Sequence, residues 1–400
     1  MAMDVAKVRG QYLSLGDGWT YLNAHQCPQI PERVSVAVSR AFRRAPVLAE
    51  TEQSSGSHSR LAAPGSLQGA SLIDDARRAV ADLCAVTPDR VILGPDLSVL
   101  YLRLAQAMRP LLRRTSSLVL SGLDDPALTG PFAELGGAVR YAQPDLGTGA
   151  LPASQYRELV DGSTRLVALS AAHPHLGTVA PVADIVELTR SRSRAWVLID
   201  ATAYLPYRPL SVADWDADIV ALDIAALGGP PIAALVFRDP AMFRRIDPLP
   251  PMPIVAGLAG GVPALVDHLA ELAEGGGTRR TRLQRSMTQL GEYLADLAAD
   301  LHMLLGTLPA VHILGASGEA GDGGRGDRIP RLSFAVRGVP ASTVHQRLLD
   351  NSLVTTILPE SQLATDMGVD EVGGAVTVSL SPFTIRHDLE HLTRVVASLA

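Results

Sequence analysis

The chain has 400 residues, of which 47% are hydrophobic and 19% charged, and its formal net charge is −6 at pH 7. This balance predicts a globular chain of about two domains and excludes an intrinsically disordered one. Arginines are scattered among acidic residues rather than gathered in one stretch. Neither a nucleic-acid partner nor an anionic membrane surface is therefore expected.

The sequence carries no targeting or disulfide signal. No run of about 18 uninterrupted apolar residues occurs, so no membrane span is expected. The first residues lack the apolar core of a signal peptide. The two cysteines, Cys27 and Cys84, are too few for a disulfide framework. We expect free thiols in a cytoplasmic protein.

Helical periodicity alternates with short apolar runs from residue 70 to about residue 240. Helices are predicted at Ser71–Val86, with Ser71 as the N-cap, at Leu97–Met108 and at Val182–Arg192. The predicted strands are Arg90–Gly94, Ser117–Leu120, Arg165–Ser170, Ala195–Asp200, Asp218–Asp223 and Ile232–Phe237.

Nearly continuous apolar strands between helices indicate an α/β fold. Its sheet is expected to be mainly parallel and covered by helices on both faces. Ligands in such folds bind at the carboxyl ends of the strands. Asp200, Asp223 and the residues after Gly94 lie at such ends.

The pattern changes near residue 250. Helices are predicted at Pro263–Leu272 and Thr278–Leu305. A second α+β unit then follows, made of Arg331–Val336, Ala341–Asn351, Ala375–Leu380 and a helix from Arg386. The polar tracts Glu50–Gly69 and Gly315–Asp327 predict surface loops.

Lysine is almost absent from this chain. Lys7 is the only one, and the other 34 basic residues are arginine. Codon usage in a GC-rich genome explains a general scarcity of lysine. It does not explain the loss of a functional amine, because arginine stays protonated and cannot replace an amine nucleophile.

Several phrases, in this order, resemble the class V aminotransferases, the group of fold-type I pyridoxal-phosphate enzymes that includes the cysteine desulfurases. The similarity is greatest to an actinobacterial branch called cysteine-desulfurase-like. The phrases are Ser14-Leu-Gly-Asp-Gly-Trp, Leu123-Asp-Asp, Gly228-Gly-Pro-Pro-Ile and Val372-Gly-Gly-Ala-Val-Thr-Val. These phrases are distributed over nearly the whole length of the chain.

The resemblance implies a fold-type I architecture with a large, doubly wound, mainly parallel sheet domain and a smaller α+β C-terminal domain. It places an N-terminal segment near the cleft in residues 1–30, the large domain in 31–255, and connecting helices with the small domain in 256–400. It also implies a homodimer with its clefts at the subunit interface.

Two parts of the cofactor site match the family. Asp200 occupies the position of the carboxylate that binds the pyridine nitrogen, although an aspartate that caps the next turn is an equal alternative. The turn Asp96, Leu97 and Ser98 matches the phosphate-binding start of a helix. Relatives tend to have a neutral amide at the Asp96 position, and a plain helix N-cap is the favoured reading of Asp96.

At four other positions of the family's cofactor and substrate site, this chain has a residue that cannot serve the family's function. Ala226 lies at the position of the lysine that links covalently to the cofactor, and Asp125 at that of the stacking base. Pro174, at the position of the asparagine that binds the ring hydroxyl, has no donor, and Thr377 replaces the arginine that clamps a substrate carboxylate.

Three further features bear on the chemistry. Ala203 lies where many relatives have glutamine or histidine beside the ring. The loop Leu353–Gly373 contains no cysteine, which argues against desulfuration. His173 and His175 flank Pro174 and are candidate pocket residues, although a structural histidine is more common.

Two alternatives bring in the N-terminal segment. Lys7 is the only amine side chain able to replace the missing lysine. His25 and Cys27 are the residue types of a thiolate–imidazole pair, although their separation by two residues on a loop is a weak signal for one. An unreactive thiol is the more common outcome for such a cysteine.

Three functions follow as hypotheses. The first is a catalytically degenerate relative that binds a small molecule or a protein partner, with no covalently bound cofactor. The second is a lysine-independent enzyme that uses pyridoxamine phosphate, with His173 or His175 as base. The third is a different enzyme in an acidic cleft formed by Asp96, Asp125 and Asp223, where carboxylates perturb one another or hold a cation.

Overall fold

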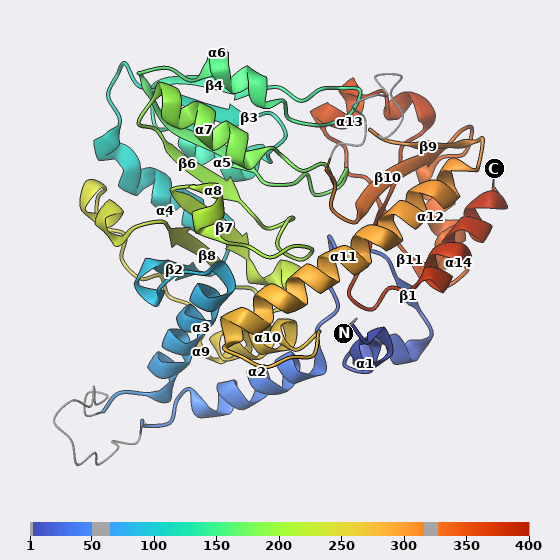
Figure 1. The fold of residues 1–400 in the computed structure, drawn as a ribbon, viewed down its shortest axis with the longest axis horizontal. Coiled ribbons are helices and arrows are strands. Elements are labelled where there is room, and N and C mark those ends of the chain that lie inside the picture. Colours follow the sequence, from blue (N-terminus) through green and yellow to red (C-terminus); the bar gives the residue numbers. More distant parts are fainter. Residues whose placement is uncertain (1–2, 50–64, 316–326, 400) are drawn as a thin grey trace.

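The computed structural model describes residues 3–49, 65–315 and 327–399. Most of the two polar tracts predicted to be loops, Glu50–Gly69 and Gly315–Asp327, lies outside the described residues. At the end of the first tract, residues 68 and 69 belong to a helix rather than a loop. Figure 1 shows a large sheet covered by helices beside a smaller α+β unit, with a long helix, α11, running beneath both.

The large sheet has seven strands in the order β2-β8-β7-β6-β5-β3-β4. Its strands are β2 (Val91–Gly94), β3 (Ser117–Ser121), β4 (Ala138–Ala142), β5 (Thr164–Ser170), β6 (Trp196–Asp200), β7 (Ile219–Asp223) and β8 (Ala233–Phe237). Strand β8 is antiparallel to both β2 and β7, whereas the other pairs are parallel. The predicted mainly parallel sheet is thus confirmed, with one antiparallel strand.

Alternate side chains of each central strand enter two different cores, because successive side chains point to opposite faces of a sheet. In β6, Val197 and Ile199 belong to one cluster, while Trp196 and Leu198 belong to the other. Both faces are covered by helices, so both sets are apolar. This explains why the strands form nearly continuous apolar runs in the sequence.

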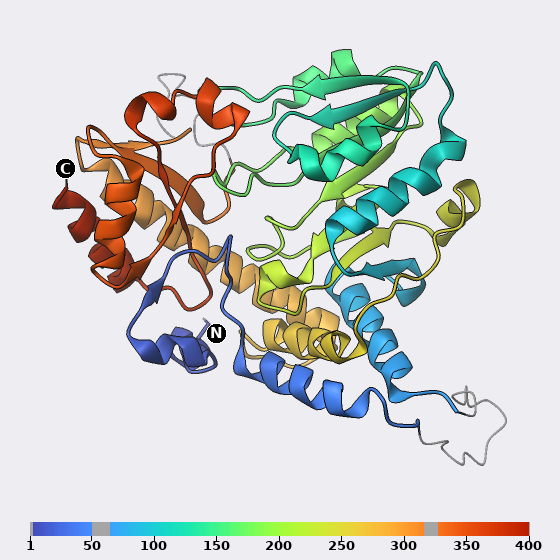
Figure 2. The same ribbon diagram turned by 180° about the vertical axis from the view of Figure 1, so that it is seen from behind.

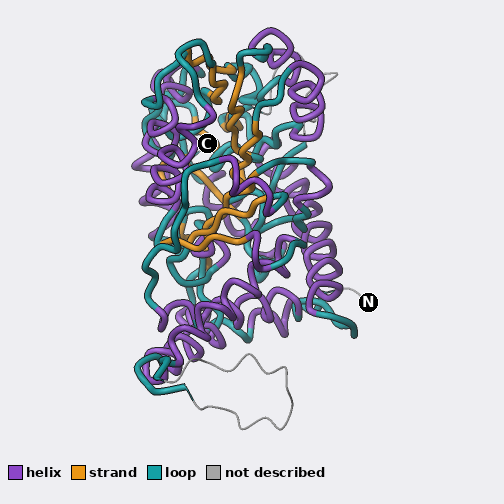
Figure 3. The backbone as a smooth tube through the Cα atoms, turned by 90° about the vertical axis from the view of Figure 1, so that its left-hand side faces the viewer, coloured by secondary structure: helices purple, strands orange, loops and turns teal. Residues whose placement is uncertain are grey.

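Helices cover the two faces unequally. On one face lie α4 (Leu97–Met108) and α5 (Pro126–Ala133), which are in front in Figure 2. On the other lie α3 (Gln68–Cys84), α6 (Tyr156–Leu159), α7 (Val182–Arg192) and α8 (Val212–Trp215). Seen edge-on in Figure 3, the strands run between these two helical layers.

The C-terminal unit is built on an antiparallel sheet with the order β12-β13-β10-β9. Its strands are β9 (Val311–Ile313), β10 (Arg331–Val336), β12 (Thr356–Ile357) and β13 (Val376–Ser379). The helices α12 (Ala341–Leu349), α13 (Gln362–Asp366) and α14 (Arg386–Ala397) complete the unit.

Connecting helices pack on both parts of the molecule. The short α9 (Ala256–Ala259) and α10 (Gly261–Ala270) lie against α3 and α2 (Glu32–Arg44), whereas α11 (Arg279–Gly306) reaches α14. The domain boundary expected near residue 255 remains a prediction, because these helices belong to the packing of both parts.

The N-terminal segment crosses to the C-terminal unit. After α1 (Val5–Arg9), β1 (Thr20–Tyr21) pairs in parallel with β11 (Leu353–Val354). The following Asn23 forms a bridge with the last residue of β13, Ser379. The loop after β1 is thus fixed beside the small sheet.

Single-turn 3-10 helices join many of these elements. They are η1 (Leu13–Asp17), η2 (Pro88–Arg90), η3 (Arg109–Leu111), η4 (Ala153–Gln155), η5 (Ile224–Leu227), η6 (Pro240–Arg245) and η7 (Asp370–Val372). None of the helices in the three described ranges combines the length and apolarity needed to cross a bilayer.

Two helix predictions differ from the structure in informative ways. Ser71 is not an N-cap: α3 begins three residues earlier, and the Ser71 hydroxyl donates to the Gln68 carbonyl at 2.8 Å. The long helix α2 was not predicted. Its apolar side chains Val34, Val38 and Ala41 recur at helical spacing, which was the available signal for this helix.

Candidate functional site

The carboxyl ends of β6 and β7 bring Asp200 and Asp223 to one edge of the large sheet, as predicted. Asp124, in the turn after β3, joins them, and its Oδ1 accepts the Ser170 N–H at the end of β5, at 3.0 Å. The three carboxylates are close enough that Asp200 raises the pKa of each of the other two. Like charges at a shared site oppose ionisation.

Asp200 is held from two sides. Its Oδ1 accepts the Thr202 N–H at 2.8 Å, and its Oδ2 accepts the Tyr101 hydroxyl of α4 at 3.3 Å. Burial raises the pKa of Asp200, while these bonds oppose the rise. The structure therefore shows Asp200 as a cap of the turn after its strand, and its role toward a pyridine nitrogen stays a prediction.

Asp124 is a site residue that the sequence reasoning did not select. Burial, and to a smaller extent the Asp200 carboxylate, raise its pKa to about 7. It lines a cleft of about 1220 Å³ between the large sheet and the C-terminal unit. The sequence analysis selected its neighbour Asp125 instead, because Asp125 aligns with the stacking base of the family. A carboxyl directly after a fully buried strand was the available signal for Asp124.

The start of α4 is already occupied by a carboxylate. Asp96 is the N-cap, and its Oδ1 accepts the Val99 N–H at 2.8 Å. Leu97 is buried and Ser98 is exposed. A phosphate at this helix end would meet the Asp96 charge in the position where the amides point, and like charges repel there.

Asp125 is an exposed N-cap of α5. Its Oδ1 accepts the Ala127 N–H at 2.8 Å, and Pro126 takes the first helical position. Although Asp125 lines the large cleft, this bond commits the carboxylate to the helix start. Burial, followed by the Asp200 and Asp96 carboxylates, raises the pKa of Asp223, so Asp96 and Asp223 influence each other as predicted. The described residues include no group of three or more His, Cys, Asp or Glu that could hold a metal.

Ala226 lies in η5, the single turn that follows β7. Asp223 caps this turn by accepting the Ala225 N–H at 2.9 Å. Gly228 ends the turn with a φ of +80°, and any Cβ there would approach the Gln29 carbonyl to 2.5 Å. The turn is thus packed against the N-terminal loop, and Ala226 lines a small pocket.

Lys7 is the single lysine of the chain, and its service as a cofactor lysine stays a prediction. It is exposed on α1, whose buried face is formed by Val8. Lys7 is not among the residues that line the pocket of Ala226. The neighbouring Arg9 bonds to Phe383 and Asp388, which holds α1 against the C-terminal unit.

His173 has a structural role. Its Nδ1 accepts the backbone N–H of His175 at 3.3 Å and that of Leu176 at 3.0 Å. Nδ1 must then be unprotonated, so the neutral ring carries its proton on Nε2. Burial, with the neighbouring His175 and Arg331, lowers the pKa of His173 to about 3. His173 therefore cannot act as a general base near neutral pH through either ring nitrogen.

His175 is less committed. Its Nδ1 is buried without a hydrogen-bond partner among the described residues. Burial and Arg331 lower its pKa to about 4. Its ring makes edge contacts with those of His173 and His25, with centroids 5.9 and 5.5 Å apart.

His25 does not pair with Cys27. Its Nδ1 lies 2.8 Å from the Ser379 hydroxyl and its Nε2 lies 2.7 Å from the Thr356 hydroxyl, so both ring nitrogens are taken. Cys27 is exposed, and the other cysteine, Cys84, is buried in α3. The predicted thiolate–imidazole alternative is therefore wrong for this geometry.

Thr377 is also satisfied locally. Its hydroxyl lies 2.8 Å from that of Ser333 on the neighbouring strand β10. Two residues before Ser333 on the same strand lies Arg331, which is 4% exposed and lines the pocket of Ala226. Sequence reasoning missed Arg331. The signal for it was a charged residue at the head of a strand in which every residue is buried.

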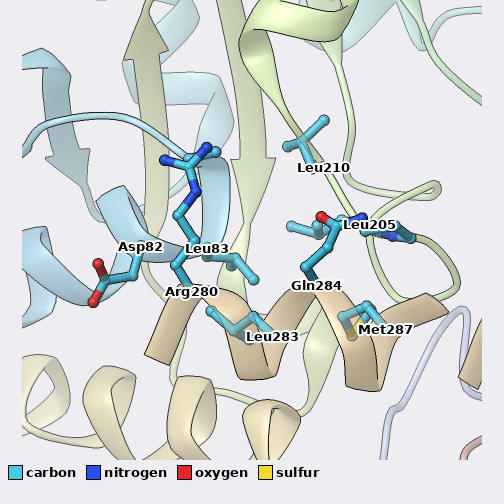
Figure 4. A pocket seen from close by; sticks show the side chains of 10 residues that line it. Asp82, Leu83, Leu205, Leu210, Arg280, Leu283, Gln284 and Met287 are labelled. Atoms are coloured by element: carbon cyan, nitrogen blue, oxygen red, sulfur yellow. The ribbon is translucent and has the colours of Figure 1, made fainter. Parts of the chain in front are cut away.

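The expected site residues do not all share one cavity. Asp125, His173 and His175 line the large cleft, together with residues between Leu358 and Val369 that include part of α13. Ala226 lines the separate pocket. Ala203 is buried. A further small pocket between α3 and α11, shown in Figure 4, is lined by Asp82 and Arg280 together with mainly apolar side chains.

The sequence of this chain matches a known protein family. The sequence model of the family Aminotransferase class-V matches residues 48–242. The uncharacterized protein MT3887 of Mycobacterium tuberculosis is 38% identical, over 100% of both chains.

Solved structures show the same fold. The apo cysteine desulfurase of Thermococcus onnurineus NA1 superposes with a TM-score of 0.80 at 16% identity, covering 100% of this chain and 98% of that one. A variant of C-DES with glycine covalently linked to its PLP cofactor superposes with a TM-score of 0.74 at 19% identity, covering 97% and 98%. The chain therefore belongs to the class V aminotransferase family and has the fold of the cysteine desulfurases.

Proposed function

We propose that this family member does not perform lysine-dependent pyridoxal-phosphate catalysis or cysteine desulfuration, and that it acts as a binding protein. The observation that carries the proposal is Ala226 at the lysine position, on a turn that is well formed and packed. A methyl group can neither link to a carbonyl nor move a proton. The only lysine, Lys7, is exposed on α1.

The remaining residues also fit pyridoxal phosphate poorly. Asp96 places a carboxylate where the phosphate would bind, and Asp125 has no flat face for the ring and caps α5. Pro174 has no donor for the ring hydroxyl. Only Asp200 matches. We therefore assign no step of a reaction to this cofactor.

Covalent trapping tests the proposal. The purified chain is incubated with pyridoxal phosphate, reduced with borohydride and analysed by peptide mass spectrometry. We expect no stoichiometric adduct on the wild-type chain, and an adduct at position 226 in the Ala226→Lys variant, which shows that the position faces a space able to admit the cofactor.

The control is Lys7→Arg, which leaves no lysine side chain. A stoichiometric wild-type adduct that Lys7→Arg removes would contradict the proposal, because it would show that Lys7 serves as the cofactor lysine. A small amount of labelling at the N-terminal amine in all variants would be non-specific.

A second candidate function is a lysine-independent enzyme that uses pyridoxamine phosphate. Two observations favour it: the strand-end carboxylate Asp200, and the unpartnered Nδ1 of His175. The measurement is the melting temperature with pyridoxamine phosphate. An increase that Asp200→Ala abolishes and Asp125→Ala retains would support this candidate over the binding function.

We also propose a homodimer. Apolar side chains that are half or more exposed gather around α2: Ile30, Phe42, Leu48 and Val255. A second copy of the chain is the occupant that family resemblance suggests for this face. Sedimentation should show a dimer that Phe42→Glu dissociates, while Leu102→Glu, on exposed α4 surface, leaves it intact. A wild-type monomer would contradict the proposal.

A further inference from the structure

Arg331 is a buried cation whose partners are all neutral. It is 4% exposed at the start of β10. Its Nε donates to the Tyr207 hydroxyl at 3.0 Å, and its Nη1 donates to the Pro174 carbonyl at 3.2 Å. Its guanidinium carbon lies 5.1 Å from the centre of the Tyr207 ring.

No carboxylate balances this charge. Within residues 3–49, 65–315 and 327–399, none of the ion pairs includes Arg331. By contrast, Arg190 and Arg238 both bond to the buried Asp218. Burying an unpaired ion costs on the order of several kcal/mol, so a buried arginine is normally paired.

The groups around Arg331 do not supply the missing charge. His25, His173 and His175 lie close enough for Arg331 to lower their pKa values, and with burial these fall to between about 3 and 4. All three rings are therefore neutral near pH 7. The net charge of this cluster is that of the guanidinium alone.

The guanidinium is held in a fixed orientation. The Tyr207 hydroxyl accepts from Arg331 and donates to the Leu380 carbonyl at 3.2 Å, so it cannot turn away. Gly177 has a φ of +75°, and a Cβ there would overlap the Arg331 carbonyl oxygen. The loop carrying Pro174 can therefore pack directly on β10. Of the five N–H groups of Arg331, the hydrogen bonds with described residues use two.

The remaining donors lie at a pocket that also reaches the lysine position. Arg331 and Ala226 both line the same small pocket, and its other walls are mainly apolar. They include Tyr12, Leu269 and Phe383. A lysine side chain at position 226 would extend into this space, so its replacement by alanine leaves room for a ligand.

We propose that this pocket binds a small monocarboxylate with an apolar body, and that its carboxylate pairs with Arg331. A planar guanidinium matches the two oxygens of a carboxylate, and the apolar walls match a hydrocarbon chain. Arg331 lies on β10, whereas the family's clamp position, Thr377, is on β13 and bonds to Ser333. The inference rests on the proposed binding function and names its ligand class.

Calorimetric titration of the full chain with sodium butyrate tests this assignment. Butyramide, the neutral analogue, and sodium chloride at equal ionic strength are the ligand controls. We expect saturable binding of butyrate only, weakened at least tenfold by Arg331→Gln and unchanged by Arg78→Gln, which removes an exposed arginine of α3. Unchanged affinity in Arg331→Gln would overturn the proposal. Equal binding of butyramide, or no butyrate binding up to about 50 mM, would also overturn it.

Ala226→Leu provides a variant that keeps the arginine. The larger side chain fills part of the pocket, so butyrate binding should fall at least tenfold while the melting temperature stays within a few degrees of wild type. Butyrate binding that survives in Ala226→Leu would place the ligand elsewhere and overturn the proposal. Inorganic phosphate that competes as strongly as butyrate would contradict the carboxylate assignment.

The outcomes separate this inference from the proposed function. If butyrate does not bind and the borohydride experiment is negative, only the Arg331 site is wrong. If a lysine adduct forms while butyrate binding still depends on Arg331, the site stands and the non-catalytic function is wrong.

Discussion

The acidic edge of the large sheet and the arginine–histidine cluster beside β10 balance their charges in different ways. Asp96, Asp200 and Asp223 each accept a backbone N–H from the turn or helix that follows them. In the part of the chain that the structure describes, the partners of Arg331 are a phenol hydroxyl, a carbonyl and an aromatic face. The acidic edge therefore has backbone donors as partners, whereas the described residues supply no anion to the basic cluster.

This difference changes where a ligand is expected. The family resemblance directs attention to the strand ends, where phosphate and ring would bind. In this chain those positions carry carboxylates committed to caps, and the unbalanced charge lies on the C-terminal unit instead. The two regions also respond to pH with opposite signs, which allows each to be tested separately.

The largest expected effect is acid destabilisation through the histidine cluster. The pKa values of His25, His173 and His175 are lowered from 6.5 to between about 3 and 4. From pH 6.5 down towards pH 4.5 the unfolded chain binds protons at these rings and the folded chain does not. Stability is therefore present above pH 6.5 and is lost as the pH falls.

Urea unfolding between pH 4.5 and 5.5 measures this loss. Each of these histidines contributes a slope of about 1.4 kcal/mol per pH unit. In His25→Asn the slope should decrease by about that amount, whereas His387→Asn should not change it. An unchanged slope in His25→Asn would show that this ring is protonated in the folded chain.

Asp124 should show the opposite sign. Its pKa is raised to about 7, so between pH 4.5 and 6.5 the folded chain holds a proton that the unfolded chain has lost. This contribution to stability is present at low pH and is lost as the pH rises through 7.

The Asp124→Asn variant should not lose stability in this way as the pH rises, because an asparagine side chain has no proton to release. Relative to wild type, the variant should gain about 1.4 kcal/mol of unfolding free energy per pH unit between pH 4.5 and 6.5. Asp125→Asn, at the exposed neighbouring position, is the control and should show no such trend. A parallel pH profile for Asp124→Asn and wild type would place the Asp124 pKa in the ordinary range.

His173→Leu should lower the unfolding free energy by about 1–3 kcal/mol, because two backbone N–H groups lose their acceptor in a buried turn. The measurement is urea unfolding at pH 7.5, where every histidine of the cluster is neutral. His312→Leu on β9 is the matched control. An equal cost for both variants would mean that the Nδ1 bonds contribute little.

The smallest effect concerns the start of α4. Asp96→Ala should cost about 1 kcal/mol, the usual value of a lost N-cap, and Asp96→Asn less. Thermal unfolding of both variants measures this order. A more stable Asp96→Asn would show that the carboxylate is strained by its neighbours and would favour an anion site at this helix.

Much of the large sheet was predictable because its signals are local. The predicted bounds of Leu97–Met108 and Val182–Arg192 are those of α4 and α7. Asp200 and Asp223 end their strands as expected. Strand β4 was missed because it is an edge strand with exposed positions and no apolar run.

The sequence by itself determined the fold class and showed that Lys7 is the single lysine, because periodicity and residue identity can be read from the chain alone. Only the tertiary structure decided how charges are balanced. Arg331 meets Tyr207 and Pro174 across 124 and 157 residues. Such contacts depend on how the small sheet packs on the large one, and no local pattern encodes that packing.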